Sequence, residues 1–107
     1  MEGEAQQGLE PDELELAVVL HALSDPVRLR IVRSLHGRPG QPCGSLIGPC
    51  VAKSTLSHHL KVLREAGLTS TRNNGTQRLV SLREADLEAS FPGLLGAVAG
   101  RATVAQA

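Results

Sequence analysis

Residues 53–82 have the sequence K-S-T-L-S-H-H-L-K-V-L-R-E-A-G-L-T-S-T-R-N-N-G-T-Q-R-L-V-S-L, and this stretch decides the fold. Leucines at helical spacing in its first half predict a helix from about Lys53 to Ala66 that ends at Gly67. The inward positions of this helix are Leu56, Leu60 and Leu63. Its outward side chains are hydroxyl, imidazole and basic groups, and they belong to Lys53, Ser54, Thr55, Ser57, His58, Lys61 and Arg64.

The second half of this stretch predicts a β-hairpin. Two short runs rich in Thr, Val and Leu, residues 68–72 and 77–82, are joined by N-N-G-T. An Asn-Gly centre favours a tight turn because both residues tolerate a positive φ. Arg72 and Arg78 flank the tip, and Asn74 lies within it. A basic hairpin after a polar helix is typical of a wing, which lies along a phosphate backbone or enters a minor groove.

A shorter helical segment precedes the helix over 53–66. Residues 43–48 have room for one or two helical turns before Pro49 interrupts them. Two such pieces, the second presenting polar and basic side chains, form the helix-turn-helix pattern. Hydroxyls and imidazoles reach base edges, whereas Lys and Arg reach phosphates. A basic helix face can also be merely solvated, but the flanking hydroxyls, the wing and the scarcity of acids favour phosphate contact.

The motif S-D-P marks the start of an earlier helix. Asp25 is the expected N-cap, Pro26 occupies the first helical position, and Gly37 ends the helix. Its apolar line consists of Val27, Ile31 and Leu35. Residues 38–42 are expected to form a loop.

The first predicted helix is capped by Asp12 and runs to about Leu23. It has two apolar faces: Leu16, Val19, Leu20 and Leu23 on one, and Leu14, Ala17, Val18 and Ala22 on the other. A helix that is apolar nearly all round must be buried on both sides, which so small a domain cannot achieve alone. The second face therefore indicates a partner subunit.

After the hairpin another helix begins, is interrupted at residues 91–93 (F-P-G), and then resumes. The expected fold class is mainly α (α+β), a winged helix-turn-helix with about five helices and a two-stranded wing. One domain is expected over residues 12–99, with flexible arms at 1–11 and 100–107. The first and last helices are the expected dimerisation elements.

The 107 residues suffice for one domain, and eleven basic residues balance eleven acidic ones. Their distribution is uneven, because residues 1–25 hold seven acids and no Lys or Arg, whereas residues 26–83 hold ten Lys or Arg and one acid. Such a local field suits a polyanion, since neutralised phosphates release counterions. Nucleic acid is the leading partner class. Phe91 is the only aromatic residue, which argues against single-strand binding by base stacking and favours double-stranded DNA.

No apolar run approaches the roughly 20 residues that span a bilayer, and the acidic start lacks the order of a signal peptide. The two cysteines are expected to be thiols. We therefore expect a cytoplasmic protein without a membrane partner. No Ser-His-Asp, Cys-His or paired-carboxylate arrangement falls on a plausible pocket, and the glycines form no phosphate loop, so the sequence argues against an enzyme.

Four stretches in register resemble the ArsR/SmtB family of winged-helix transcriptional regulators. They are A-L-S-D-P-V-R-L-R-I-V (22–32), S-T-L-S-H-H-L-K-V-L-R-E-A-G-L (54–68), R-N-N-G-T-Q-R (72–78) and V-S-L (80–82). The resemblance implies a homodimer that binds an imperfect inverted repeat and represses transcription until an inducer weakens the complex. It implies base reading by Lys53, Ser54, Ser57 and His58, with Arg72 and Arg78 serving the wing. The expected dimer contacts are Leu14, Ala17, Val18, Leu94, Leu95 and Val98.

The metal sites of that family are not intact in this sequence. Its Cys-x-Cys motif corresponds to Q-P-C-G-S-L at 41–46, which has one cysteine. Its site on the last helix needs histidines. The potential metal ligands on this helix are acids alone, Glu84, Asp86 and Glu88. Metal sensing therefore does not follow from the resemblance. Cys43, at the expected start of a helix, is a candidate for a redox or metal role. It and His21, which a dimer could bring to its two-fold axis, are the candidate ligands for Zn or Ni.

Several other side chains have ordinary structural interpretations. Cys50 is expected to pack as a small hydrophobe, and a helical segment would hold it about 10 Å from Cys43, too far for a disulfide. His59 is expected to pack beside Leu60, and His36 to be structural. Two alternatives remain open: a separate sensing partner protein, or a winged-helix module that binds a protein and no specific DNA.

Overall fold

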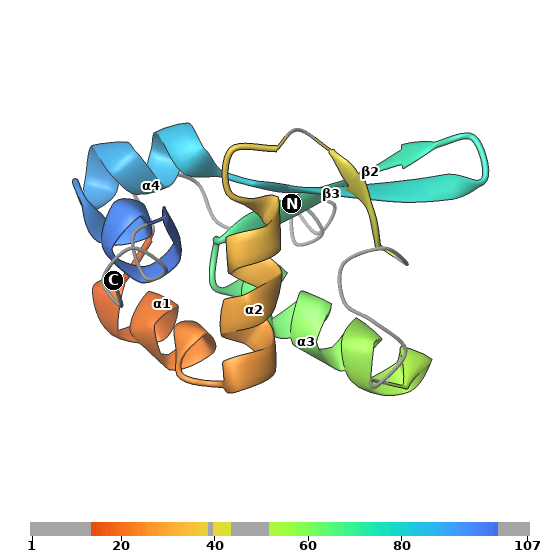
Figure 1. The fold of residues 1–107 in the computed structure, drawn as a ribbon, viewed down its shortest axis with the longest axis horizontal. Coiled ribbons are helices and arrows are strands. Elements are labelled where there is room, and N and C mark those ends of the chain that lie inside the picture. Colours follow the sequence, from red (N-terminus) through yellow and green to blue (C-terminus); the bar gives the residue numbers. More distant parts are fainter. Residues whose placement is uncertain (1–13, 39, 44–51, 101–107) are drawn as a thin grey trace, which may run out of the picture.

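The computed structural model describes residues 14–38, 40–43 and 52–100. These ranges contain four α-helices, a π-helical segment and three strands (Figure 1). In chain order they are α1 (Leu16–Leu23), α2 (Pro26–Leu35), β1 (Gln41–Pro42), α3 (Lys53–Glu65), β2 (Thr69–Asn74), β3 (Gln77–Leu82), α4 (Glu84–Ser90) and η4 (Gly96–Gly100). The predicted arm at 1–11 and most of the helical turn predicted before Pro49 lie outside the described residues. So does the predicted arm at 100–107 except for its first residue, because Gly100 ends η4.

The start of α2 is as the S-D-P motif predicts. The Asp25 carboxylate accepts hydrogen bonds from the backbone amides of Val27 (2.7 Å) and Arg28 (3.2 Å), and Pro26 is the first helical residue. The carboxylate thus satisfies two amides that have no partner within the helix. The helix ends at Leu35, and Gly37 follows with a φ of 77°.

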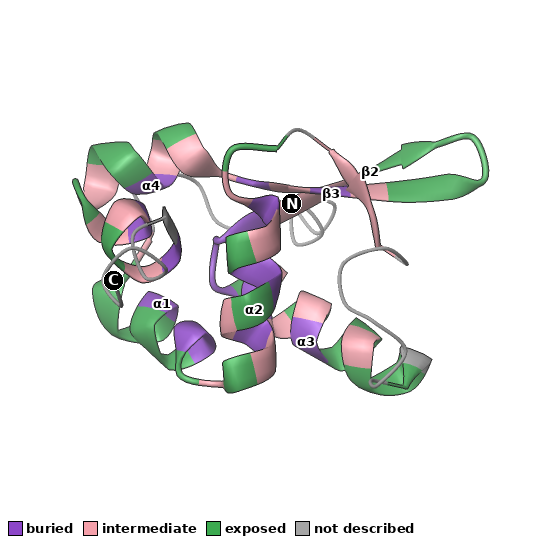
Figure 2. Ribbon diagram, in the orientation of Figure 1, coloured by how far each residue is buried: buried purple, intermediate pink, exposed green. Residues whose placement is uncertain are grey.

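Helix α1 differs from its prediction in length and in which face is buried. It begins at Leu16, not directly after residue 12, so Leu14 precedes the helix. The residues it buries are Val19, Ala22 and Leu23, whereas Leu16, Val18 and Leu20 are exposed (Figure 2). The sequence pattern instead groups Leu16 and Leu20 with Val19 and Leu23, and assigns Ala22 to the face that indicates a partner subunit. A helix with apolar residues on all sides has little periodic signal, so its sequence does not fix the inward direction.

The sheet has three antiparallel strands in the order β1-β3-β2, so β3 is central. Strand β1 corrects the expected loop at 38–42: Gln41 pairs with Val80, and Pro42 with Leu79. A two-residue edge strand containing proline has no alternation for a sequence pattern to detect. In the hairpin Asn74 pairs with Gln77, which leaves a two-residue loop centred on Gly75 and Thr76 rather than on Asn74 and Gly75.

The turn at the tip has a positive φ at one residue only. Gly75 has a φ of 68°, and no non-glycine residue in the described ranges has a positive φ. A positive φ at the first of two loop residues is the type II′ pattern, in which glycine holds that place. The strand β2 is therefore longer than expected and includes Asn73 and Asn74.

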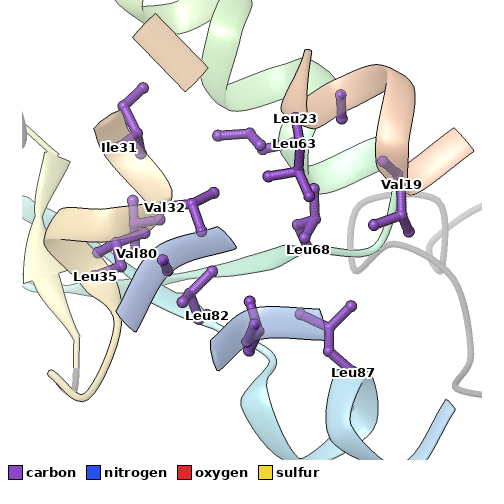
Figure 3. Close-up of a cluster of buried hydrophobic side chains, with 14 residues drawn as sticks. Val19, Leu23, Ile31, Val32, Leu35, Leu63, Leu68, Val80, Leu82 and Leu87 are labelled. Carbon is purple, nitrogen blue, oxygen red and sulfur yellow. The ribbon is translucent and has the colours of Figure 1, made fainter. Parts of the chain in front are cut away.

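The core lies between the sheet and the helices, and every described helix contributes to it (Figure 3). Its largest fully buried side chains include Ile31, Leu35, Leu63, Leu68 and Leu87. The predicted interruption after α4 is confirmed, because the chain turns at residues 91–93 before η4. Leu95, expected at a dimer interface, is 3% exposed and belongs to the core of its own chain.

Candidate DNA-binding surface

Helix α3 is anchored by one apolar side and by its carboxyl end. Leu63 is fully buried, and Leu56 and Leu60 are half-buried against the core, as their spacing predicted. The helix stops where Gly67 adopts a φ of 91°. The side chain of Leu14 occupies the space that a Cβ on Gly67 would need, so this residue, expected at a dimer interface, packs within its own chain.

The opposite side of α3 is open to solvent. Ser54, Thr55, Ser57, His58 and Lys61 are exposed and Arg64 is half-buried. Lys53 begins the helix, and its side chain lies outside the description. The Lys61 ammonium lies 4.0 Å from the Glu65 carboxylate, and the two side chains are 62% and 60% exposed. Such a pair contributes at most about 1 kcal/mol, so it does not keep Lys61 from another anion.

The hairpin presents its polar side chains beyond the core. Arg72, Asn74 and Arg78 are all exposed. Arg78 pairs with Asn73, and Arg72 pairs with Leu79, one position further along each strand. Because successive side chains of a strand alternate between faces, the two arginines lie on opposite faces of the hairpin. Sequence reasoning had given them one shared role without this distinction.

The amino end of α3 and the tip of the hairpin protrude at the same end of the molecule (Figure 1). Helices α1 and α4 lie at the opposite end, on the left of that view. A duplex placed against the protruding end would meet the exposed side of α3 and the hairpin together. This arrangement is compatible with a helix in one groove and a basic ribbon over the neighbouring backbone.

Of the nine basic residues in 26–83 whose side chains are described, two are turned inward. Arg28 is 8% exposed, and its Nε donates to the carbonyl oxygen of Ala22 at 2.7 Å. The side chain of Arg83 is 11% exposed, and its Nη2 lies 3.1 Å from Oδ2 of Asp86. These guanidinium groups hold the fold together, so the charge available to a polyanion is smaller than the sequence count. The exposed basic residues include Arg30, Arg33, Arg38, Lys61, Arg72 and Arg78.

A buried polar contact lies directly beneath the exposed side of α3. His59 is 8% exposed, and its Nδ1 lies 3.2 Å from Nη1 of Arg28. Its neighbour His58 is exposed. The expected packing role of His59 is therefore confirmed, whereas its partnership with Arg28 had no signal in the sequence, where the two residues are 31 positions apart.

Comparisons with known proteins identify the family. A family model described as a helix-turn-helix domain matches residues 23–72. The uncharacterized HTH-type transcriptional regulator YceK of Bacillus subtilis is 42% identical over 86 residues, which are 78% of this chain and 86% of that protein. The arsenical resistance operon repressor of Staphylococcus xylosus is 36% identical over 74 residues, which are 69% of this chain and 71% of that protein. The chain belongs to the ArsR/SmtB family.

A solved structure agrees with this ArsR/SmtB assignment. The crystal structure of the transcriptional repressor BigR from Xylella fastidiosa matches with a TM-score of 0.59 and 36% sequence identity, over 71% of this chain and 85% of that one. The predicted winged helix-turn-helix fold is thus confirmed. As an ArsR/SmtB protein the chain is a DNA-binding transcriptional repressor and not an enzyme. No helix within the described ranges is long and apolar enough to cross a membrane.

The residues considered for sensing in this ArsR/SmtB chain do not form a metal site in the described ranges. Cys43 is a half-buried free thiol packed against the core, and Cys50 lies outside the described residues. His21 is exposed at the end of α1. Within the described part of the chain, no group of three or more His, Cys, Asp or Glu side chains lies together. The residues described in one chain therefore do not fit a bound metal.

His36 has a structural partner that the sequence did not indicate. Its Nδ1 lies 3.4 Å from Oε1 of Glu84, and the other oxygen of that carboxylate accepts the amide of Gly37 at 2.8 Å. The contact joins the end of α2 to the start of α4. Glu84, one of the acids considered for a metal site, is thus engaged within the fold.

Proposed function

We propose that two copies of this chain form a homodimer that places two α3 helices in successive major grooves of an inverted-repeat operator. The observation that carries the proposal is the exposure of large apolar side chains on α1. Leu16, Val18 and Leu20 are 46%, 42% and 46% exposed in the single chain. Three exposed large apolar side chains on a helix of eight residues indicate a surface that another protein covers.

Further apolar side chains are available at the other dimerisation element. Leu94 and Val98 are half-buried beside the core, and Ala17 is exposed on α1. In Figure 1, α1 lies at the same end as the chain's carboxyl-terminal segments and away from the hairpin tip. A second copy joined there would leave both α3 helices free. Their separation would then set the spacing of the half-sites, about one helical turn apart.

The roles within each half-site follow from side-chain chemistry and exposure. Ser54, Thr55, Ser57 and His58 carry short groups suited to base edges, whereas Lys61 and Arg64 suit phosphates. Arg72, Asn74 and Arg78 would bind the flanking backbone or minor groove. Release of the operator would follow when an inducer, or a separate partner protein, favours dimers whose two α3 helices cannot both enter. A metal ion could act as inducer only with ligands beyond those described in one chain.

The test is sedimentation velocity at micromolar concentration, combined with gel shifts on the region upstream of the chain's own gene. We expect a dimer that prefers that fragment to random DNA. Leu20→Glu should give a monomer with much weaker binding, because a charge would be buried at the interface. Gln77→Glu, an exposed site at the start of β3 beside the hairpin tip and away from α1, is the control for dimerisation and should remain dimeric. A wild-type monomer without preference for any promoter fragment would refute the proposal.

A further inference from the structure

One buried guanidinium ties three helices together. Arg28, in the first turn of α2, donates from Nε to the carbonyl oxygen of Ala22 in the last turn of α1, at 2.7 Å. From Nη1 it reaches Nδ1 of His59 in the middle of α3, at 3.2 Å. Both side chains are only 8% exposed. Water therefore has little access to either side of the contact.

The chemistry of the pair fixes the protonation state of His59. A guanidinium group only donates hydrogen bonds and stays charged in proteins. The Nδ1 atom of His59 must therefore be the acceptor, which requires a neutral ring with its proton on Nε2. A protonated imidazole donates from both nitrogens, and it would place a second positive charge beside Arg28 in a buried position.

The contact lies one residue from the proposed base-reading surface. The rings of His58 and His59 are neighbours, with centroids 5.7 Å apart and planes inclined by 55°. His58 is exposed on the side of α3 that would enter the groove, while His59 points into the fold. Any rotation or sliding of α3 that frees His59 from Arg28 would also move His58 and Ser57 against the DNA.

We propose that the Arg28–His59 contact is the positioning contact of the recognition helix, and that operator binding requires His59 to be neutral. Arg28 and His59 touch no DNA in this account; they act through α3, and the inference rests on the proposed DNA-binding function. The family assignment accounts for DNA binding, whereas the contact would fix the orientation of α3 relative to α1 and α2. Acidification that protonates the His59 ring should then weaken operator binding.

The described charged groups around His59 have opposite effects on a protonated His59 ring. Arg28 on α2 repels a protonated ring across 3.2 Å, whereas the carboxylate of Asp25, at the start of α2, attracts it. Asp25 is already held by two backbone amides, so it is not free to move towards His59. On α3 itself, His58 would add a further positive charge when protonated. The repulsion by Arg28, which is in direct contact, therefore outweighs the attraction by Asp25. A protonated His59 ring then moves away from Arg28.

The test compares DNA binding at pH 7.5 and pH 5.5 on the fragment upstream of the chain's own gene. For the wild type we expect a fall in affinity of about tenfold or more, the scale of losing a buried hydrogen bond to a charged group. In His59→Asn, the amide oxygen can replace Nδ1 as acceptor but takes up no proton. This variant should bind within about threefold of wild type at pH 7.5 and should lose the acid-sensitive fall. In His59→Leu the guanidinium has no acceptor, and binding should be weak at both pH values.

The matched control is His58→Asn on the exposed side of the same helix turn. Protonation of His58 adds charge that favours phosphate binding, so this variant should keep the fall in affinity or show a steeper one. His21 and His36 are unchanged in all variants, so they contribute equally to each binding curve that is compared. If His59→Asn and wild type have the same pH dependence, the inference is wrong.

A measurement without DNA separates this inference from the proposed function. Nitrogen-15 shifts of the His59 ring in the folded protein should show an unprotonated Nδ1 and a protonated Nε2 at pH 7.5. A protonated Nδ1 would overturn the inference even if operator binding is normal. Conversely, if these shifts are as expected and no pH gives binding to the upstream fragment, the proposed operator function fails and the structural contact stands. Thermal unfolding of each variant monitors folding, and His59→Asn carries the test if His59→Leu does not fold.

Discussion

Arg72 and Arg78 project from opposite faces of the β2–β3 hairpin, although both lie within six residues of its tip. Arg78 shares its face with Val80 and Leu82, which are buried further along the strand, whereas Arg72 shares its face with its cross-strand partner Leu79. The face of Arg78 is thus the one that turns towards the core further along the strand. A duplex lying against α3 would meet that face of the hairpin.

The two arginines should therefore contribute unequally to DNA binding. We expect Arg78→Ala to weaken binding to all sequences and to flatten the salt dependence, lowering the slope of log K against log salt by about 0.9 for one lost phosphate contact. Arg72→Ala is the matched control, with the same loss of charge on the other face, and should change the slope less. The measurement is fluorescence anisotropy over a salt series. Equal changes of the slope in the two variants would show that DNA binding does not depend on which face of the hairpin carries the arginine.

The cap of α2 should make a measurable contribution to stability. Asp25 accepts two backbone amides, and replacing an N-cap Asp by Ala costs about 1 kcal/mol, with a range of about 0.5 to 2. We expect Asp25→Ala to lower the free energy of unfolding by that amount at pH 7, as measured by urea denaturation. Asp25→Asn is the control, since Asn is also a good N-cap, and should lose less. A loss as large for Asn as for Ala would mean that charge, not capping, dominates.

The same carboxylate has a predictable pH dependence. Burial raises the pKa of Asp25, but the amides of Arg28 and Val27, together with the nearby His59 and Arg28 side chains, hold the pKa below its ordinary value of 3.8. A carboxyl group with a lowered pKa in the folded state stabilises the fold above its unfolded pKa, and this contribution disappears as the pH falls through the folded value. The stability difference between wild type and Asp25→Ala should therefore be constant at neutral pH and shrink below about pH 4. A difference that grows on acidification would contradict the lowered pKa.

The sequence predicted the elements whose signals are local. Asp25 and Pro26 start α2, the leucine spacing defines α3, and the Asn-Gly segment indicates the hairpin. The predictions that were wrong concern features that depend on tertiary packing. The inward side of α1 follows from what surrounds Val19, because apolar residues cover the whole helix. Strand β1 exists only because β3 offers it a partner.

The same distinction applies to the candidate site. Hydroxyl and basic side chains on α3 were assigned to its outward side from the periodicity alone, and the described members of that set are exposed or half-buried. The periodicity could not show that Arg28 is buried, because an arginine off the apolar line of α2 is ordinarily solvated. Its burial depends on two acceptors, Ala22 and His59, supplied by other helices.

Gly67 should tolerate no side chain, for two separate reasons. Its φ of 91° is unfavourable for other residues, and the Leu14 side chain fills the space of a Cβ. We expect Gly67→Ala to destabilise the fold by more than about 1 kcal/mol. The control is Gly96→Ala in η4, where no atom lies within 4 Å of the added Cβ. This substitution should leave the stability of the fold unchanged or raise it. Chemical denaturation measures both, and similar stabilities for the two variants would contradict the close packing of Leu14.

Ser57 and Lys61 should separate base reading from phosphate binding on one helix. Both are exposed on the outer side of α3 and lie one turn apart, but a hydroxyl suits a base edge and an ammonium suits a phosphate. We expect Ser57→Ala to lose about 1 kcal/mol on the operator and almost nothing on random DNA, and to shift the preferred half-site. Lys61→Ala should weaken binding to both DNAs alike, because a phosphate contact carries no sequence information. Binding to a library of half-site variants measures the preference. Equal losses on operator and random DNA for Ser57→Ala would show that this side chain does not read bases.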